Sequence, residues 1–258
     1  INSPQLLMIS GIGDAEHLKD KGIEVVNNLK GVGQNLQDHL ETYIQQECKT
    51  PNTLYTYTKL IPKVLAGIQR FMFKSGPCSK SFLEAGGFAK SSPERKIANI
   101  QFHFFPSFVI NHGLVDPDAH GYQLHASPNH PKSRGYIKLN SSDPYDYPKI
   151  LFNYLQDEED LKQTRECIHV ARKILSQPAL AEHAGKEVGP GTEAQSDDEL
   201  NELLPLSLSS YLNSHNLSSK SSISSSSSSS ISKLKLLKLS KHLQLNNNNN
   251  NNIKNDPK

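Results

Sequence analysis

The sequence changes in character at about Leu204, and this change sets how much of the chain can fold. Up to that residue, apolar, charged, glycine and proline residues are mixed as in globular domains. After it come the runs SSISSSSSSSISK and NNNNNNN, which lack the apolar periodicity needed to offset the chain entropy lost on folding. We therefore expect a globular part over residues 1–204 and a low-complexity, disordered tail over residues 205–258.

Charge and cysteine content argue against several classes of protein. The net charge of +2 at pH 7 gives no reason to expect a nucleic-acid partner. The three cysteines have no C-x-x-C spacing, and no two histidines have the H-x-x-x-H spacing of a helical metal site, so we expect neither a disulfide framework nor a metal. No stretch approaches the roughly 18 apolar residues of a membrane span.

Hydrophobic periodicity predicts a mixture of helices and strands. Helical apolar spacing covers residues 60–73, and the clearest helix begins with acidic residues 157–160 at its positive end and stops at Pro178. A further capped helix is expected to begin at Ser196. Strands are predicted for ETYIQQECKT, SFLEAGGFAKS, IANIQFHFFPSFVI, GYQLHASPNH, RGYIKLNS and PKILFNYL. Because turn residues separate most of them, we expect an antiparallel, meander-like sheet.

The stretch GVGQNLQDH is a candidate binding loop. Gly33 would allow a close approach of the backbone to a ligand, and Asn35, Asp38 and His39 would supply polar contacts. The stretch is not a dinucleotide-binding fingerprint, because a third glycine and a following helix are absent. An ordinary turn is the alternative interpretation.

Glu84 is a carboxylate in the apolar setting SFLEAGGF. With Phe82, Phe88 or a neighbouring tyrosine it could form a charged and aromatic cage for an ammonium group. A solvent-facing strand residue is the alternative. His103 and His125 lie on predicted strands, where we interpret them as hydrogen-bonded sheet histidines.

Several stretches together resemble one enzyme family. SPQLLMISGIGDAEHLKDKGIEVVNNLKGVGQNLQDHL resembles the second signature region of the glucose–methanol–choline oxidoreductases, which are FAD-dependent alcohol oxidases and dehydrogenases. The stretches FLEAGGFAKS, NIQFHFFPSFVINHG and YQLHASPNHPKSRGYIKLNSSDPYDYPKILFNYL are most similar to the choline-oxidising members of that family. The resemblance extends from residue 1 to about residue 204, with its motifs in the family's order.

The resemblance implies a mixed fold, α+β with α/β parts, that combines a section of an FAD-binding domain with a substrate domain. Residues 1–40 would be a late segment of the FAD-binding domain. Residues 41–155 would form the substrate domain, an antiparallel sheet flanked by helices. Residues 156–204 would be a helical segment returning to the FAD side, ahead of the tail over 205–258.

The resemblance also implies a reaction and a set of contacts. Family members of this type oxidise choline to betaine aldehyde, with a hydride passing to FAD and electrons then passing to a membrane quinone pool. A eukaryotic member is expected in mitochondria. Glu84 matches the acidic residue before the family's Gly-Gly-Phe and would hold the trimethylammonium group. Gly33, Asn35, Asp38 and His39 would contact the cofactor.

Two family motifs have no counterpart in this sequence. The three-glycine dinucleotide fingerprint is absent, and so is the His-Pro-x-Gly-Thr-Cys stretch that carries the catalytic histidine. His215 stands near the expected place of that histidine but lacks its neighbours, and we interpret it as accidental. We assign no catalytic residue, and we expect an inactive interior section of such an enzyme that does not bind FAD tightly.

Alternatives remain for the function and for the tail. The chain could be a non-catalytic remnant that binds a quaternary ammonium ligand or a partner protein. The tail after Leu204 could result from a frameshift, a retained intron or a wrongly assigned gene end, or it could be a genuine polar extension.

Overall fold

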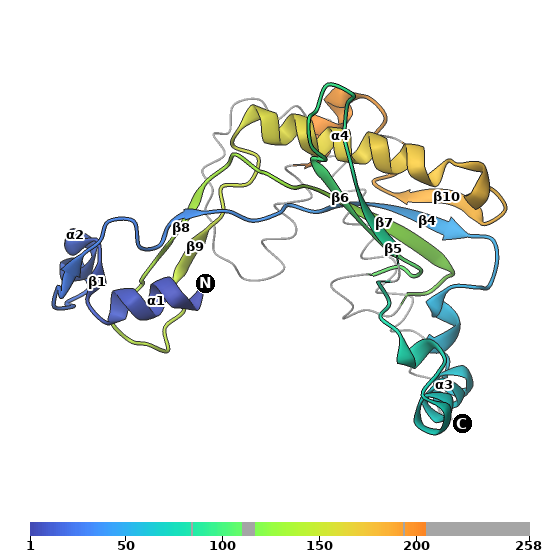
Figure 1. Ribbon diagram of the computed structural model, residues 1–258, viewed down its shortest axis with the longest axis horizontal. Coiled ribbons are helices and arrows are strands. Elements are labelled where there is room, and N and C mark those ends of the chain that lie inside the picture. Colours follow the sequence, from blue (N-terminus) through green and yellow to red (C-terminus); the bar gives the residue numbers. More distant parts are fainter. Residues whose placement is uncertain (84, 110–116, 193, 205–258) are drawn as a thin grey trace, which may run out of the picture. The chain divides into compact units, whose positions relative to one another are not determined.

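The computed structural model describes residues 1–83, 85–109, 117–192 and 194–204 (Figure 1). The tail predicted over residues 205–258 lies outside the described residues, as do His215 and Glu84. Within the described residues, no helix combines the length and the apolar character needed to cross a membrane.

Short elements make up the first part of the chain. They are α1 (Asn2–Ile9), β1 (Ile12–Gly13), α2 (Ala15–Asp20) and β2 (Asn27–Asn28). Strands β1 and β2 pair in parallel. Asp14 caps α2, because its carboxylate accepts hydrogen bonds from the backbone N–H groups of Glu16 at 3.0 Å and His17 at 3.4 Å.

A three-stranded antiparallel sheet packs with these first elements. Its strand order is β3 (Gln34–Leu36), β8 (Gly135–Lys138) and β9 (Lys149–Leu151). The buried core that joins them consists of Met8, Leu18, Ile137 and Leu139. Strands from far along the chain therefore share a core with the amino-terminal elements. The division at residues 40 and 155 stays a prediction.

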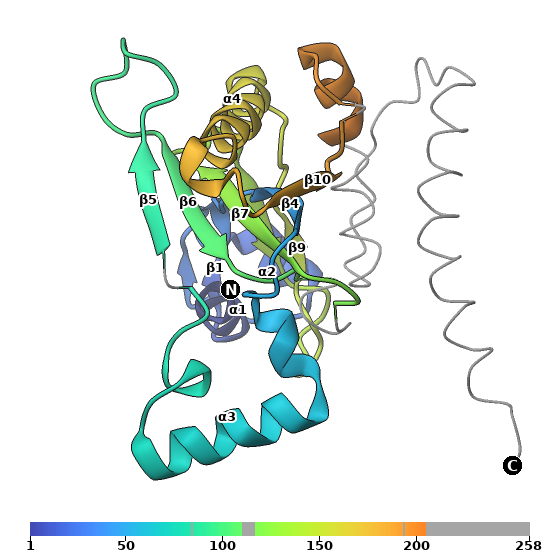
Figure 2. The same cartoon turned by 90° about the vertical axis from the view of Figure 1, so that its right-hand side faces the viewer.

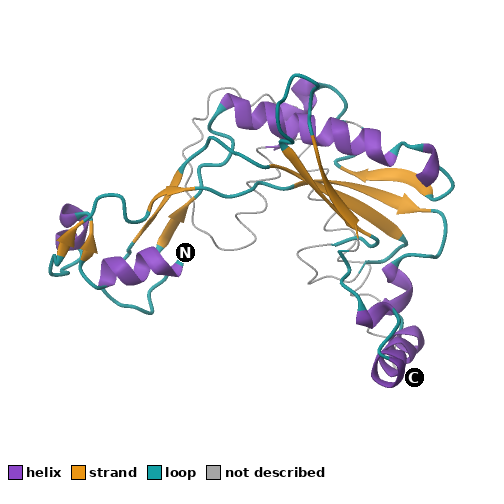
Figure 3. Cartoon of the chain, in the orientation of Figure 1, coloured by secondary structure: helices purple, strands orange, loops and turns teal. Residues whose placement is uncertain are grey.

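The larger sheet has five antiparallel strands (Figure 3). Its order is β10 (Ala184–Gly189), β4 (Thr42–Cys48), β7 (Gly121–Pro128), β6 (Ile100–Phe105) and β5 (Ala85–Ala89). The antiparallel pairing is confirmed, but the meander is wrong. Strand β4 inserts between β10 and β7, and β8 and β9 belong to the other sheet because β8 pairs with β3.

Helix α4 (Glu158–Leu175) covers one face of the five-stranded sheet (Figure 1). Asp157 caps it as a hydrogen-bond acceptor for the Glu159 N–H. Its buried stripe meets alternate residues of the strands in a core that includes Ile44, Ile100, Phe102, Tyr122, Leu124, Ala126, Cys167, Ile168, Ala171 and Leu175. The predicted helix is thereby confirmed, and the alternation of the strands leaves their other face free for polar side chains.

The remaining helices are short or lie outside this core. Helix α3 (Leu60–Phe73) is confirmed at the predicted bounds and lies between the 3-10 turns η1 (Leu54–Thr58) and η2 (Pro77–Ser79) (Figure 2). The turn η4 (Pro178–Leu180) follows α4. A helix over 197–204 begins after Ser196, as predicted, in a capping box with Glu199.

Candidate functional site

The face of the five-stranded sheet opposite α4 carries polar and aromatic side chains. His103 on β6 and Tyr43 on β4 are both cross-strand partners of His125 on β7, so the three side chains share one face. Gln45 and Gln123 are a further cross-strand pair on this face. We call these residues the polar face: Tyr43, Gln45, His103, Gln123 and His125.

Hydrogen bonds fix the orientation of the central residues. The Oε1 atom of Gln123, a side chain only 1% exposed, accepts bonds from the Val109 backbone N–H at 3.1 Å and from Gln45 Nε2 at 2.9 Å. The amide nitrogen of Gln123 therefore points at His125 Nε2 and donates to it. His125 Nδ1 must then carry the ring proton, which it donates to Glu41 Oε2 at 2.8 Å. The network assigns a neutral His125 with the proton on Nδ1.

This network has two chemical consequences. The hydrogen bond from His125 lowers the pKa of Glu41, so this carboxylate, 42% exposed, stays ionised to lower pH than an ordinary glutamate. His125 is also unsuited to act as a base, because both of its ring nitrogens are already engaged. It is the hydrogen-bonded sheet histidine that its sequence context predicts.

His103 differs from His125. Its ring is half-buried, and within the described residues it makes no hydrogen bond. His103 lies between His125 on β7 and Gly86 on β5, where a Cβ would come within 2.7 Å of the Phe102 carbonyl oxygen and 4.0 Å of His103 Nδ1. Of the two histidines on this face, His103 is thus the one whose ring nitrogens make no hydrogen bond to a described residue.

Aromatic rings flank these polar groups. The Phe105 ring lies 4.4 Å from the His125 ring, and the Tyr43 ring lies 5.4 Å from it on the other side, measured between centroids. Phe82 in turn lies 5.7 Å from Phe105. Glu41 bonds to the His125 ring that these aromatic rings flank, and a carboxylate together with aromatic faces is the kind of environment that attracts an organic cation.

The structure describes the aromatic residues of the predicted ammonium cage but not its carboxylate. Glu84 lies outside the described residues, so its role stays a prediction. Phe82 is exposed just before it, and Phe88 is exposed on β5, opposite Gln101 on β6. Phe88 belongs to the same face as Gly86, and hence to the polar face side of the sheet.

The loop containing Gly33, Asn35, Asp38 and His39 is held mainly by contacts within the protein. Gly33 has φ +79°, and a Cβ there would come within 2.2 Å of the Ile137 carbonyl oxygen on β8. A glycine is required here because the backbones of this loop and of β8 approach closely. The alternative interpretation, an ordinary turn, therefore explains why a glycine stands at this position. Asn35 also has a positive φ, of 60°, and is exposed.

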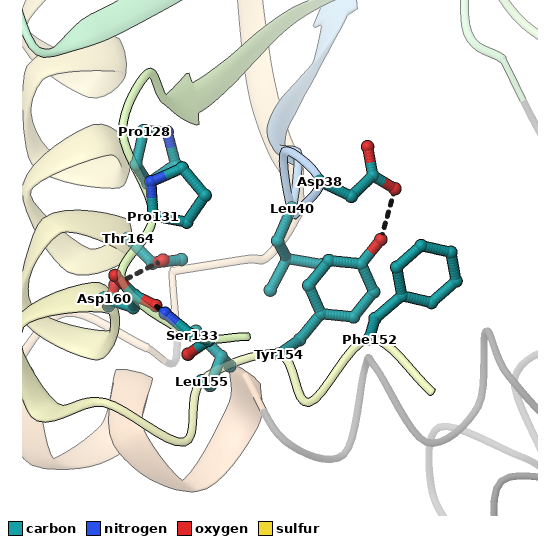
Figure 4. A pocket seen from close by; sticks show the side chains of 10 residues that line it. All are labelled: Asp38, Leu40, Pro128, Pro131, Ser133, Phe152, Tyr154, Leu155, Asp160 and Thr164. Carbon is teal, nitrogen blue, oxygen red and sulfur yellow. Dashed lines mark hydrogen bonds between the residues drawn. The ribbon is translucent and has the colours of Figure 1, made fainter. Parts of the chain in front are cut away.

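Asp38 and His39 are committed to local hydrogen bonds. Asp38 accepts from the Tyr154 hydroxyl at 2.5 Å and from the His39 backbone N–H at 2.9 Å (Figure 4). The His39 Nε2–H donates to the Asn129 carbonyl at 3.2 Å. These bonds tie the loop to β7 and to the segment before α4. The contacts of these residues with a cofactor stay a prediction.

The geometry of this loop does not suit the diphosphate of FAD. A diphosphate site of the Rossmann type needs a glycine turn that leads into a helix amino terminus. Here Gly33 leads into strand β3, and the space beside it is filled by β8. The described residues therefore do not form a diphosphate cradle, and no reaction step is assigned through FAD on this loop.

A small cavity lies between the loop and the start of α4 (Figure 4). Its volume is about 20 Å³, which is room for a single water molecule. Asp160 beside it accepts hydrogen bonds from the backbone N–H groups of Lys132 and Ser133, both at 2.7 Å. The cavity is too small for a substrate, and both carboxylate oxygens of Asp160 already accept hydrogen bonds. We therefore interpret it as a packing feature and not as a binding site.

His120 serves a structural contact. His120 Nδ1 lies 2.8 Å from the Thr53 hydroxyl, and the ring packs edge-on against Tyr55. Over residues 1–83, 85–109, 117–192 and 194–204, no group of three or more histidine, cysteine, aspartate or glutamate side chains is placed to hold a metal ion.

The fold matches flavoprotein oxidoreductase structures. The chain is similar to pyridoxine 4-oxidase from Mesorbium loti, with a TM-score of 0.62 and 23% identity over 78% of this chain and 36% of that one. It is also similar to a variant of formate oxidase from Aspergillus oryzae RIB40 with altered FAD modification, with a TM-score of 0.70 and 21% identity over 78% and 40% of the two chains.

The sequence identifies the family. Two models described as GMC oxidoreductase match residues 1–41 and residues 131–221. The chain belongs to the GMC oxidoreductase family. It is 49% identical over 200 residues to mitochondrial choline dehydrogenase of Homo sapiens and 44% identical over 200 residues to oxygen-dependent choline dehydrogenase of Staphylococcus xylosus. These matches cover 78% of this chain but 34% and 36% of the relatives, so the chain spans about a third of their length.

Sequence reasoning missed Glu41 and Gln123. Neither belongs to a local motif. Both bond to His125, and the contact between Glu41 and His125 arises only because β4 and β7 are neighbours in the sheet. The available signal was the alternation of ETYIQQEC and GYQLHASP. It places Tyr43 and Gln45 on one side of β4 and Gln123 and His125 on one side of β7, but it does not say that these strands are neighbours.

Proposed function

We propose that the chain supplies the substrate-binding sheet of an FAD-dependent oxidoreductase that oxidises the CH–OH group of choline to betaine aldehyde. The observation that carries this proposal is the identity of 43–49% with choline dehydrogenases over 200 or more residues. FAD would supply the hydride acceptor. For a eukaryotic source the human relative supports a mitochondrial location, and a quinone-linked electron acceptor belongs to the same proposal.

The polar face supports the choice of a cationic substrate. Glu41 keeps its negative charge through the bond with His125, and the rings of Tyr43 and Phe105 flank the His125 ring. A quaternary ammonium group cannot donate a hydrogen bond, so attraction by a carboxylate and by aromatic faces is the means of recognition left to it. We propose that Glu84 adds a second carboxylate to this environment.

Choline binding by the purified chain tests the proposal. Calorimetric titration should show saturable binding of choline and of tetramethylammonium, because both present the same methylated cation. Glu84→Gln should weaken binding about 10-fold, the effect of losing one charge–cation contact of roughly 1.4 kcal/mol. Glu16→Gln removes an exposed carboxylate far along the chain from the polar face residues and should leave the affinity unchanged.

Activity separates the two functional hypotheses. Choline-dependent dye reduction after addition of FAD would establish an enzyme. Choline binding without reduction would favour the non-catalytic binding module. Failure of both choline and tetramethylammonium to bind would contradict the substrate assignment.

A further inference from the structure

A group of polar side chains surrounds Cys48, at the carboxyl end of β4. Cys48 is half-buried, and its Sγ atom lies 3.5 Å from the Thr50 hydroxyl oxygen. The same Thr50 oxygen lies 2.8 Å from His183 Nδ1, and His183 Nε2 lies 3.2 Å from Glu182 Oε1. Asn52 Oδ1 lies 2.7 Å from the Thr50 oxygen and 3.7 Å from the Cys48 sulfur. We call these five residues the Cys48 cluster.

The contacts of the Cys48 cluster connect the thiol to a base. Ionised Glu182 can only accept a hydrogen bond, so His183 Nε2 carries the ring proton and Nδ1 of the neutral ring can accept one. The Thr50 hydroxyl has a single proton, which it can turn to Asn52 or to His183. When that proton is turned to His183, the Thr50 oxygen can accept the proton of the Cys48 thiol. Transfer along this path leaves the thiolate, which is the nucleophilic form of cysteine.

The buried hydroxyl of Tyr122 lies near this cluster and lacks an acceptor. Tyr122 is 3% exposed, and in the described part of the chain its hydroxyl makes no hydrogen bond. Tyr122 pairs with Gln46, two residues before Cys48, so its side chain lies on the same sheet face as Cys48. Burial raises the pKa of Tyr122, and a charge on Cys48 raises it further. The sulfur is thus within electrostatic reach of the hydroxyl but beyond hydrogen-bond contact, and an oxygen bonded to the sulfur would supply the missing acceptor.

The other two cysteines of the chain lack this environment. Cys78 is exposed in η2, and its thiol makes no hydrogen bond to a described residue. Cys167 is 0% exposed, and burial raises its pKa to about 12, so its thiol stays protonated and out of reach. Cys48 is therefore the cysteine that combines access to a small reagent with a base.

We propose that Cys48 is a site of reversible oxidation by hydrogen peroxide and that Tyr122 stabilises the sulfenic acid formed there. The Cys48 thiolate attacks one peroxide oxygen, so an S–O bond forms as the O–O bond breaks. The sulfur loses two electrons to the peroxide, and the leaving hydroxide takes the proton from His183 and departs as water. The oxygen on the sulfur accepts the hydrogen bond that Tyr122 donates. A small thiol reverses the change by condensing with the sulfenic acid to a disulfide and water, and a second thiol releases Cys48 by exchange.

Peroxide treatment of the full 258-residue chain tests the reactivity of Cys48. Dimedone traps sulfenic acids, and mass spectrometry of the peptides gives the rate at each cysteine. We expect oxidation at Cys48 to be about 10-fold faster than at Cys78, because a base accepts the Cys48 proton. Thr50→Val and His183→Gln should each lower the rate at Cys48 about 10-fold and leave Cys78 unchanged. Thr50→Ser keeps the hydroxyl and should react at the rate of the unaltered chain, which separates loss of the proton path from loss of the fold.

Tyr122→Phe tests the second half of the proposal, because it removes the hydroxyl and keeps the ring. The first oxidation should proceed at an unchanged rate, but the sulfenic acid should decay about 5-fold faster without its hydrogen bond. Tyr145→Phe is the matched control, since Tyr145 is 90% exposed, and it should change neither rate. Equal oxidation rates at Cys48 and Cys78, or a Cys48 rate that Thr50→Val leaves unchanged, would overturn the proposed site. A sulfenic acid that decays equally fast in Tyr122→Phe and in the unaltered chain would overturn the role of Tyr122.

Discussion

Replacing Gln123 by leucine tests the hydrogen-bond network of the polar face. Gln123 is 1% exposed and makes three hydrogen bonds, to Val109, Gln45 and His125. Leucine has a similar volume but bonds to none of them. A buried polar group left without a partner costs about 1–3 kcal/mol, and the lower end applies because the three partner residues are half-buried. We expect the free energy of unfolding to fall by about 2–4 kcal/mol.

Urea denaturation followed by circular dichroism measures this loss. Gln156→Leu is the matched control, because Gln156 is exposed in the segment before α4, and it should change the free energy of unfolding by less than about 0.5 kcal/mol. If Gln123→Leu were also within about 0.5 kcal/mol of the unaltered protein, the network would not stabilise the sheet as argued.

A second substitution isolates the bond to His125. In Gln123→Glu, the carboxylate still accepts from Val109 and Gln45 but cannot donate to His125 Nε2. We expect one proton to be taken up at this contact, by the new carboxyl group or by His125 Nε2, because two acceptors would otherwise face each other. Nitrogen-15 NMR of the imidazole distinguishes a ring protonated on Nε2 from the neutral ring protonated on Nδ1. A neutral ring protonated on Nε2 in the unaltered protein would contradict the assigned orientation of the Gln123 amide.

Three further predictions follow from single positions. Gly33→Ala should lower the free energy of unfolding by about 2 kcal/mol or more, because the backbone has a positive φ and a β8 carbonyl oxygen occupies the place of the methyl group; thermal unfolding measures this. The pKa of Glu41 is lowered by its bond from His125, so its contribution to stability is present above the pKa of unfolded glutamate. This contribution is lost as the pH falls through the lower folded value, so Glu41→Gln should flatten the fall of stability with pH below the pKa of unfolded glutamate. Burial raises the pKa of Cys167 to about 12, so maleimide should label exposed Cys78 in the folded protein and Cys167 only after unfolding; equal labelling rates would contradict the buried position.

Local patterns in the sequence predicted the helices well. Residues 60–73 and the segment after Asp157 have the apolar spacing and the end signals of helices, and both helices form at the expected places. These signals lie within one or two turns of the chain, so they need no knowledge of distant partners. The strands were located for the same reason, because alternation is visible within each strand.

The order of the strands could not be read in this way. Strand β4 pairs with β7 and β10, and β8 pairs with β3, so each choice of neighbour depends on residues far along the chain. The interpretation of Gly33 shows the same difficulty. Its sequence context indicates a close approach, but only the pairing identifies a β8 carbonyl as the group that approaches. The roles proposed for Glu84, Asn35 and His39 toward ligands remain predictions.

The strand order also has a consequence for how the chain folds during synthesis. Both neighbours of β4 lie carboxyl-terminal to it, and the partner of β3 lies roughly 100 residues further along. Neither strand can complete its hydrogen bonds until these later segments have left the ribosome. Contacts of such long sequence separation slow folding, because the loop must close before the pairing is gained. We expect the nascent chain to expose both edges of β4 until β7 is made, and one edge until β10 is made, and to depend on chaperones during that interval.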